Sequence, residues 1–312
     1  MEKIGIIINP HAKKNQKIKL NRVELYKKIG SHHVDIRVTD SLDDIYRVAE
    51  DFKKKKISYL GISGGDGTLH HIISRFLYIY KSEDIPPIVL LKDGTMNTIS
   101  RTIHLKGKGT QILSKLLKTL NDKKDIKVLK RDTIKIDDKY CFLFGLGLAP
   151  NFLAKYYEGG DTGPGKAIKV LGKAVLGSMI GINVGNLFDR FNARLIVDDK
   201  ELWFYDFFGI IAATVEEIGI SFKSLFRAYE KTGTFHLIAA GMTPLELVLK
   251  LNKFRKGKPL NHRNYYESIA EKMIIIGQKK IQYMMDGELY ESNCELLVET
   301  GQIGRASCRE RV

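Results

Sequence analysis

The stretch ISGGDGTLHH, residues 62–71, combines three glycines, two hydroxyl side chains and one carboxylate directly after an apolar run. Glycine lets the backbone approach a ligand, and successive N–H groups at a helix start can bind phosphate. Asp66 would repel bare phosphate, but its carboxylate suits a Mg²⁺ ion that phosphate oxygens share. Thr68 could cap the helix or bond a phosphate. Because glycines are equally common in structural turns, the stretch alone leaves both interpretations open.

Two further turns carry amide and hydroxyl side chains at comparable places. Asn9, in NPHAKKN, follows the first apolar run, while Thr95 and Asn97, in KDGTMN, follow the fourth. Thr39 ends the second run. If these runs are parallel strands, all of the turns emerge at the same edge of one sheet, where ligands bind in such folds. This convergence favours a nucleotide site over unrelated turns.

The elements that would carry these turns alternate along the first 128 residues. A short apolar run rich in β-branched residues predicts a buried strand at 3–9, and further strands are predicted at 34–39, 59–63 and 87–92. Helices are predicted around 17–29, after a Ser41 cap, and over 68–80; the basic run Lys53–Lys56 would close the second of them. The alternation predicts an α/β domain with a Rossmann-like parallel sheet covered on both faces.

The pattern changes after about residue 125. Alternating runs with Asp-containing turns predict antiparallel strands within 126–148 and at 192–198, 201–214, 233–240, 272–277 and 280–286. Helical insertions are predicted near 166–180 and 243–254. We therefore expect a nucleotide-binding domain, 1–128, and a mainly antiparallel β-sandwich that takes the acceptor, 129–302. The last ten residues, 303–312, resemble a translated sequencing adaptor, so we interpret them as non-native, with the native C-terminus beyond Gln302.

The chain of 312 residues is basic, with 51 Lys and Arg against 36 Asp and Glu and a formal charge of +15. This surplus favours nucleic acid, acidic lipids or phosphorylated substrates as partners. Since no aromatic residues interleave with the basic run, we expect no nucleic acid partner. No uncharged apolar run reaches the ~20 residues of a membrane span, and the first run is too short for a signal peptide. We expect a cytoplasmic protein; no oligomeric state is predicted.

NPHAKK, GGDGTLHH and DGTMN, in this order and spacing, together with a late MDGELYE, resemble the diacylglycerol kinase catalytic-domain superfamily of lipid kinases. That group includes bacterial diacylglycerol kinases and eukaryotic sphingosine and ceramide kinases, and the resemblance spans nearly the whole chain. It implies an NAD kinase-like first domain, ATP and Mg²⁺ as cofactors, ATP in the cleft between the domains, and a lipid hydroxyl as substrate. The implied nucleotide contacts are Asn9, Pro10, His11, Ala12, Lys13, Thr39, Gly64, Gly65, Asp66, Gly67, Thr68, Leu69, His70, Thr95 and Asn97, with Asp66 also at the metal.

The resemblance also implies that Glu288, in MDGELYE, is the general base that takes the proton from the acceptor hydroxyl, and that Asp66 is catalytic through Mg²⁺. Phosphoryl transfer mainly requires positioning and neutralised phosphate charge, and a carboxylate beside the alcohol can accept its proton. Judged by its residues alone, however, MDGE predicts a β-hairpin, because Asp-Gly is a strong turn signal. The family match favours the catalytic interpretation.

Three positions depart from the family. Thr98 stands where Asp is usual, and Asp93 where Pro is common. Many bacterial members carry an Asp-rich stretch that in some binds a structural Mg²⁺; the corresponding YEKTGTFHLI, 229–238, has Glu230 as its only acid. We therefore expect that metal site to be absent. The lipid preference stays open between diacylglycerol and a sphingoid-type alcohol.

An uncharged run of 15 residues, 174–188, follows Lys166, Lys169 and Lys173. It could lie at an anionic membrane surface, on the inner face, with the lysines near the headgroups. It could equally be a helix that packs on the core.

Two alternatives to a lipid kinase remain. An NAD kinase shares the glycine turn, although its downstream Asn-Glu and Thr-Asp-Gly motifs are missing here. A catalytically silent nucleotide- or lipid-binding protein would explain the departures, but Asp66 and Glu288 argue against a decayed site.

Overall fold

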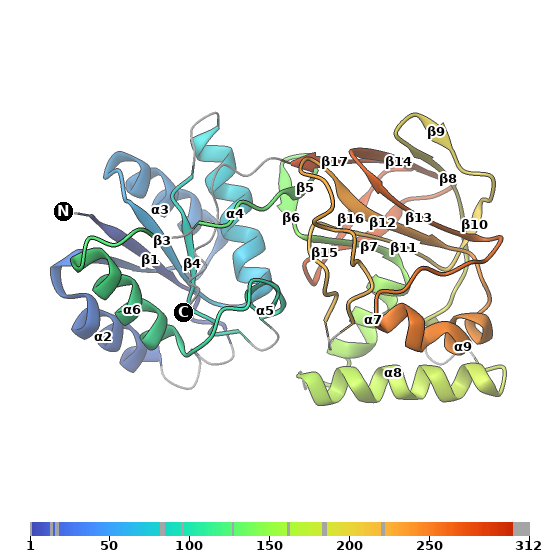
Figure 1. Ribbon diagram of the computed structural model, residues 1–312, viewed down its shortest axis with the longest axis horizontal. Coiled ribbons are helices and arrows are strands. Elements are labelled where there is room, and N and C mark those ends of the chain that lie inside the picture. The colour runs from blue at the N-terminus through green and yellow to red at the C-terminus, as the bar shows by residue number, and fades with distance from the viewer. Residues whose placement is uncertain are drawn as a thin grey trace. The chain divides into compact units, whose positions relative to one another are not determined.

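The computed structural model describes residues 2–12, 15, 19–81, 85–94, 97–126, 128–160, 163–182, 186–219 and 222–301. They form two compact units that divide after Arg131, whereas the predicted boundary follows residue 128 (Figure 1). Lys13, Thr95 and the predicted tail, 303–312, lie outside the described residues.

The first unit is built on a parallel sheet in the order β2-β1-β3-β4. Its central strand β1 is entirely buried, as expected for a parallel sheet covered on both faces. The register pairs Ile4 with Val34 on one side and with Tyr59 on the other. The strands are β1 (Ile4–Ile8), β2 (Val34–Val38), β3 (Tyr59–Ser63) and β4 (Ile88–Leu90).

Helices cover both faces of this sheet (Figure 1). α2 (Lys19–Gly30) and α6 (Gly109–Asn121) pack on one face, where Tyr26 and Leu113 join the core of β1 and β4. α3 (Leu42–Lys54) and α4 (Asp66–Tyr80) pack together on the other face. Among the described residues of this unit, the structure also has the short helices η1 (Ser31–His33) and α5 (Thr98–Thr102). The Ser41 cap is confirmed as a reciprocal capping box with Asp44. The helices α5 and α6 were not predicted.

The second unit is a sandwich of two antiparallel sheets, whose facing side chains form one core with Phe144, Leu195, Phe235 and Met273. One sheet runs β10-β8-β14-β17-β5-β6 with β9 beside β8, and the other runs β13-β12-β11-β7-β15-β16. The strands are β5 (Thr133–Ile136), β6 (Lys139–Cys141), β7 (Leu143–Gly147), β8 (Phe191–Val197), β9 (Lys200–Glu201), β10 (Asp206–Phe207), β11 (Gly209–Ala213), β12 (Phe235–Ala240), β13 (Tyr265–Ala270), β14 (Lys272–Gly277), β15 (Ile281–Met285), β16 (Glu288–Ser292) and β17 (Glu295–Gly301).

Helices of the second unit lie outside the sandwich (Figure 1). α7 (Leu148–Tyr157) packs on β7, β11 and β15, and α8 (Pro164–Met179) packs on α7 and on α9 (Pro244–Arg255). α8 and α9 occupy the two predicted insertions, while α7 was not predicted; its first residues, Leu148 and Ala149, continue the apolar run of β7. Within the described residues, no helix combines the length and hydropathy needed to cross a membrane.

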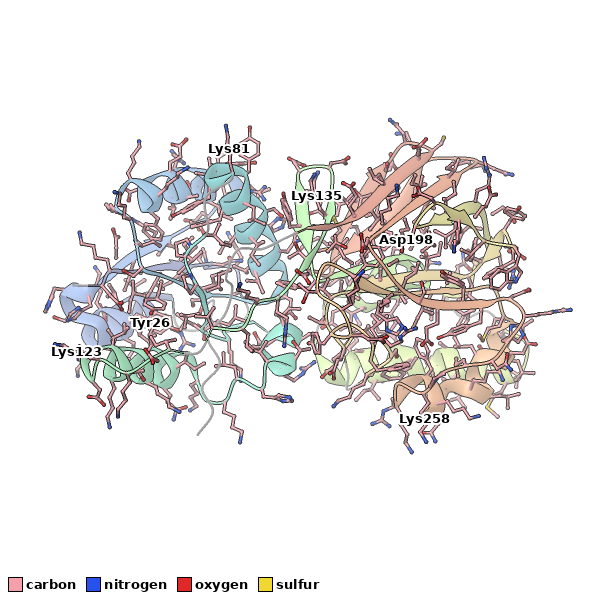
Figure 2. All side chains as sticks on the ribbon, turned by 45° about the horizontal axis from the view of Figure 1, so that its top comes forward. Tyr26, Lys81, Lys123, Lys135, Asp198 and Lys258 are labelled. Atoms are coloured by element: carbon pink, nitrogen blue, oxygen red, sulfur yellow. The ribbon has the colours of Figure 1, made fainter. Side chains whose placement is uncertain are left out.

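The positive charge is distributed over the outside of both units. Figure 2 shows Lys81 and Lys123 extending from the first unit and Lys258 from the second, all exposed. Many other cations are paired; Lys55, for example, bonds Asp35 at 2.7 Å and Asp51 at 2.8 Å. Lys55 caps the C-terminal end of α3, so the basic run closes that helix as predicted.

Candidate nucleotide site

The glycine turn joins the end of β3 to the start of α4. Ser63 ends the strand and Gly65 is the N-cap of the helix in an extended conformation. A Cβ added to Gly64 would lie 2.5 Å from the side chain of Thr68, so the turn closes only around a glycine. The first amides of α4 have no acceptor within the helix, which makes this turn suited to an anion.

Asn9, directly after β1, is hydrogen-bonded to this turn. Its Nδ2 donates to Thr68 Oγ1 at 2.8 Å, and its backbone N–H donates to the Ser63 carbonyl at 3.1 Å. Its Oδ1 accepts the backbone N–H of His11 at 2.8 Å, which shapes the following loop. The predicted proximity of Asn9 and the glycine turn is therefore present in the structure.

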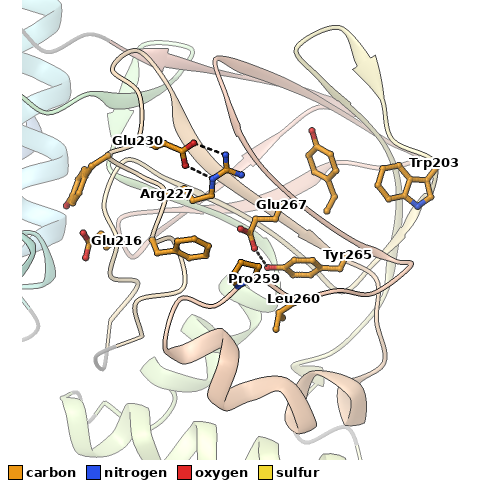
Figure 3. Close-up of a pocket in the computed structure, with 11 residues that line it drawn as sticks. Trp203, Glu216, Arg227, Glu230, Pro259, Leu260, Tyr265 and Glu267 are labelled. Carbon is orange, nitrogen blue, oxygen red and sulfur yellow. Dashed lines mark hydrogen bonds and ion pairs between the residues drawn. The ribbon is translucent and has the colours of Figure 1, made fainter.

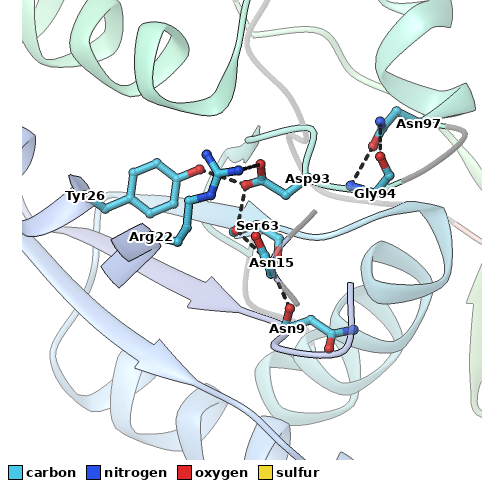
Figure 4. A network of polar contacts seen from close by, with 8 residues as sticks. All are labelled: Asn9, Asn15, Arg22, Tyr26, Ser63, Asp93, Gly94 and Asn97. Carbon is cyan, nitrogen blue, oxygen red and sulfur yellow. Dashed lines mark hydrogen bonds and ion pairs between the residues drawn. The ribbon is translucent and has the colours of Figure 1, made fainter. Parts of the chain in front are cut away.

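The loop after β4 packs against the same turn. Asn97 lies in the left-handed region, with φ of 50°; its Oδ1 accepts the Gly94 N–H at 3.2 Å and its Nδ2 donates to the Gly94 carbonyl at 2.7 Å (Figure 4). A Cβ on Gly94 would clash with the Cα of Gly65. The two glycine loops thus touch through their backbones.

Asp66 has a structural partner that was not predicted. Its carboxylate accepts the backbone N–H groups of Thr98, at 2.8 Å, and Ile99, at 3.2 Å, and so caps the start of α5. A carboxylate oxygen can accept more than one interaction, so these two hydrogen bonds do not by themselves exclude a cation. Within the described ranges, no three His, Cys, Asp or Glu side chains gather as a metal site. Mg²⁺ in proteins is commonly bound by one or two carboxylates together with substrate phosphates and water.

The other predicted nucleotide contacts differ in how far they are exposed to a ligand. Thr39 is buried after β2, and its N–H donates to the Ile8 carbonyl at 3.1 Å. Leu69 and His70 are only 3% and 1% exposed, and the Leu69 N–H donates to the Gly65 carbonyl at 3.0 Å, so these two positions offer a nucleotide little surface. Among the loop positions after β1, His11 is exposed, Ala12 is half-buried and Pro10 is buried.

Glu288 begins β16 directly after a two-residue hairpin turn. Asp286 and Gly287 have φ of 50° and 95°, which identifies a type I′ turn, and Met285 pairs with Glu288. The Asp286 carboxylate accepts the N–H groups of Phe142 and Leu143 at 2.9–3.1 Å, so that acid is structural. The predicted hairpin is therefore confirmed, and Glu288 is the first residue of its second strand.

Glu288 lies close to the end of α7. Burial, and then the charge of Glu288, raise the pKa of the Tyr157 hydroxyl above its ordinary value. Tyr157 is half exposed and keeps its proton, so it can donate to an acceptor near Glu288.

A pocket of about 810 Å³ lies in the second unit (Figure 3), and Glu288 is not among its lining residues. It borders β13, which occupies the opposite edge of the sheet from β16, five strand spacings or roughly 24 Å away. Its lining is aromatic and acidic: Trp203, Glu216, Phe226, Arg227, Tyr229, Glu230, Pro259, Leu260, Tyr265, Tyr266 and Glu267. The Glu230 carboxylate is bound by Arg227 at 2.6 Å, and Glu267 accepts the Tyr265 hydroxyl at 2.9 Å.

Comparison with known proteins identifies the domain that contains the glycine turn. The family model of the diacylglycerol kinase catalytic domain matches residues 3–129. This segment belongs to the diacylglycerol kinase catalytic domain family. A curated relative from Streptococcus pneumoniae serotype 4, named "Putative lipid kinase", is 25% identical over 152 residues, which is 48% of either protein. The match therefore spans about half the length of that relative.

Solved structures resemble the chain over nearly its whole length. A crystal structure of "a putative diacylglycerol kinase" from Bacillus anthracis str. Sterne has a TM-score of 0.73 at 16% identity, covering 99% of this chain and 97% of that one. Another, of a diacylglycerol kinase from the same organism, has a TM-score of 0.67 at 15% identity with the same coverage. At these identities the likeness concerns the fold, and it confirms the predicted parallel α/β part and antiparallel β part.

The contact between the glycine loops of the diacylglycerol kinase catalytic domain can be tested by substitution. Gly94→Ala is expected to lower the free energy of unfolding by roughly 1–3 kcal/mol, because the new methyl group overlaps the backbone of Gly65. Urea unfolding measures this loss. Gly172→Ala is the matched control, since nothing lies within 4 Å of its Cβ position in α8, and it is expected to be neutral or slightly stabilising. Equal stability of Gly94→Ala and the original protein would show that the two loops are not in close contact.

Proposed function

We propose that this protein is an ATP- and Mg²⁺-dependent kinase that transfers the γ-phosphoryl group to a lipid hydroxyl, with diacylglycerol or a sphingoid-type alcohol as acceptor. The observation that carries the proposal is the joining of three loops at the carboxyl edge of the sheet: Asn9 bonds Thr68, and Gly94 packs on Gly65. These loops lie in the segment that matches the diacylglycerol kinase catalytic domain.

Each part of the chemistry has a candidate side chain. The N–H groups at the start of α4 would hold phosphate oxygens, and the side chains of Asn9 and Thr68 keep the turn in shape. Asp66 would hold Mg²⁺, which supplies charge neutralisation when bound. Glu288 would accept the proton of the attacking hydroxyl, and Tyr157 would donate a hydrogen bond beside it.

One transfer assay separates this proposal from its alternatives. The protein is incubated with γ-labelled ATP, Mg²⁺, a mixed lipid extract and NAD. Label in the organic phase supports the lipid kinase, and purified diacylglycerol, ceramide and sphingoid bases then identify the acceptor. Labelled NADP would instead identify an NAD kinase. Binding of ATP without transfer to any acceptor would identify a catalytically silent protein.

A lipid acceptor also requires contact with a membrane, and we propose that α8 makes it. Small residues such as Ala167 and Ala174 pack inward, so the helix does pack on its unit. Its other side exposes Ile168, Leu176 and Met179, and the residues directly after the helix expose Ile180 and Ile182, with exposed fractions of 55–71% for all five. No acidic residue occurs between 164 and 182, while Lys169 and Lys173 are exposed. An apolar face flanked by cations complements an anionic bilayer surface.

The double variant Leu176→Asp/Ile180→Asp is expected to bind phosphatidylglycerol-containing vesicles at least roughly tenfold more weakly, because two apolar side chains that would enter the bilayer become charged. Vesicle sedimentation without ATP measures this binding independently of catalysis. Leu42→Asp, which alters an exposed leucine at the start of α3, is the control and is expected to leave binding unchanged. Unaltered sedimentation of the double variant would remove α8 as the membrane contact.

A further inference from the structure

A buried chain of hydrogen bonds runs beneath the three loops of the candidate nucleotide site, and Asp93 lies at its centre (Figure 4). We propose that Asp93 is a positioning residue, which fixes the loops that follow β1, β3 and β4 relative to one another and thereby sets the affinity for ATP. This inference rests on the proposed function, because it assumes that the loops bind a nucleotide.

Three donors from two other elements converge on the Asp93 carboxylate. The Ser63 hydroxyl, at the end of β3, donates to Oδ2 at 2.7 Å, and the Tyr26 hydroxyl, from α2, donates to the same oxygen at 2.8 Å. Arg22, also from α2, lies 2.9 Å from Oδ1. The side chain of Asp93 is only 3% exposed and that of Arg22 only 12%. The carboxylate is therefore occupied inside the protein and is not itself a ligand of the nucleotide.

The chain of hydrogen bonds continues from Ser63 to the loop after β1. Asn15 Nδ2 lies within 3.1 Å of both Ser63 Oγ and the Ser63 carbonyl, and 2.9 Å from the Asn9 carbonyl. Asn9 in turn bonds Thr68. Asp93 is thus linked through Ser63 and Asn15 to every loop that carries a predicted nucleotide contact, apart from the one at Thr39.

Asp93 and Asp66 hold the two glycine loops together at opposite ends. Asp93 bonds Ser63, directly before the glycine turn, while Asp66 bonds the Thr98 N–H, directly after the β4 loop. Between these two sets of hydrogen bonds, Gly94 packs against Gly65. A shift of one loop along the other would break the hydrogen bond of Asp93 to Ser63 or that of Asp66 to Thr98. The spacing of the backbone N–H groups that would face the phosphates therefore depends on both carboxylates.

Tyr26 is held in this network as a hydrogen-bond donor. Burial, and then the charge of Asp93, raise the pKa of Tyr26 far above its ordinary value, so its hydroxyl remains a donor. Tyr26 is fully buried within the first unit (Figure 2), and a Cβ on Gly109 would clash with its hydroxyl. Removing the Asp93 charge would leave Arg22 uncompensated in a buried position, a costly arrangement that the loops would relax by moving.

The test is ATP–Mg²⁺ affinity of the full chain, measured by isothermal titration calorimetry, beside urea unfolding of the same samples. Asp93→Asn is expected to weaken ATP binding at least roughly tenfold, because a hydrogen-bonded charge is lost from the network. KM for the lipid is expected to stay unchanged. Ser63→Ala is expected to weaken ATP binding roughly threefold. In the double variant Asp93→Asn/Ser63→Ala it is expected to cause no further loss, because both substitutions act on the same link between Ser63 and Asp93. Asp51→Asn, which breaks the ion pair with Arg37 on another part of this unit, is the control.

A folded Asp93→Asn variant whose ATP affinity lies within twofold of the original protein overturns the assignment, as does an equal rise in both KM values. If Asp93→Asn fails to fold, Tyr26→Phe and Ser63→Ala replace it, and unchanged ATP affinity in both would overturn the assignment. If the original protein binds no ATP, the proposed function itself has failed, which the variants alone could not indicate.

Discussion

Glu288→Gln is expected to lower kcat for lipid phosphorylation by roughly 10²-fold or more, while ATP binds with unchanged affinity. Glutamine has nearly the shape of glutamate but cannot accept the proton of the attacking hydroxyl, and general bases typically contribute 10²–10⁴-fold to a rate. The variant is expected to fold, because the type I′ turn depends on Asp286 and Gly287 rather than on Glu288. Initial rates at saturating ATP and lipid give kcat, and calorimetry gives the ATP affinity.

Glu291→Gln is the matched control for Glu288→Gln. Glu291 lies on the same strand, β16, but it is exposed and bonds Lys280 at 2.8 Å. Its substitution is expected to leave kcat unchanged. If Glu288→Gln retained the original kcat, Glu288 would not be the base, and the role of the hairpin would be structural.

Asp66→Asn is expected to lower kcat by roughly 10²-fold and to raise the Mg²⁺ concentration needed for half-maximal activity, because an amide is a poorer ligand for Mg²⁺ than a carboxylate. It is also expected to lower the free energy of unfolding by about 1 kcal/mol, since the amide can no longer accept both the Thr98 and the Ile99 N–H groups.

The two effects of Asp66→Asn distinguish its two roles. Titration of Mg²⁺ at saturating ATP measures the first, and urea unfolding measures the second. A loss of stability with an unchanged Mg²⁺ requirement would mean that Asp66 only caps α5 and that the metal is held elsewhere. Thr98→Ala keeps the backbone N–H that Asp66 binds, so it is expected to change neither measurement.

The strands β1, β3 and β4 could be predicted because they are short apolar runs with polar turns after each, whereas β2, VDIRV, alternates apolar and charged residues. The helix α5 could not, because the carboxylate that caps it, Asp66, lies more than thirty positions earlier in the chain. The run 201–214 was predicted as one strand, whereas the structure divides it into β9, β10 and β11. β9 and β10 pair with β8, whereas β11 pairs with β7 and β12. The ends of these strands are therefore set by their partners in the sheets, and the residue pattern of one segment does not show which strands will be its partners.

The candidate site was predictable where it depends on the ends of parallel strands. Asn9, the glycine turn and Asn97 share one edge because their strands are neighbours in a parallel sheet. Asp93 and Asn15 were missed as site residues, since an acid in a turn and an amide in a loop have many ordinary explanations. Only the folded chain brings Arg22, Tyr26 and Ser63 around one carboxylate. The sequence shows Asp93 at a position where the family commonly has Pro, but it does not show which side chains bind that carboxylate.

Lipid phosphorylation by this protein can be tested by the stoichiometry of transfer from γ-labelled ATP to purified diacylglycerol or a sphingoid base in mixed vesicles. We expect one labelled lipid phosphate for each ADP formed, dependence on Mg²⁺, and loss of the labelled lipid in Glu288→Gln. ADP formation that yields only inorganic phosphate, or labelled lipid that persists undiminished in Glu288→Gln, would contradict it.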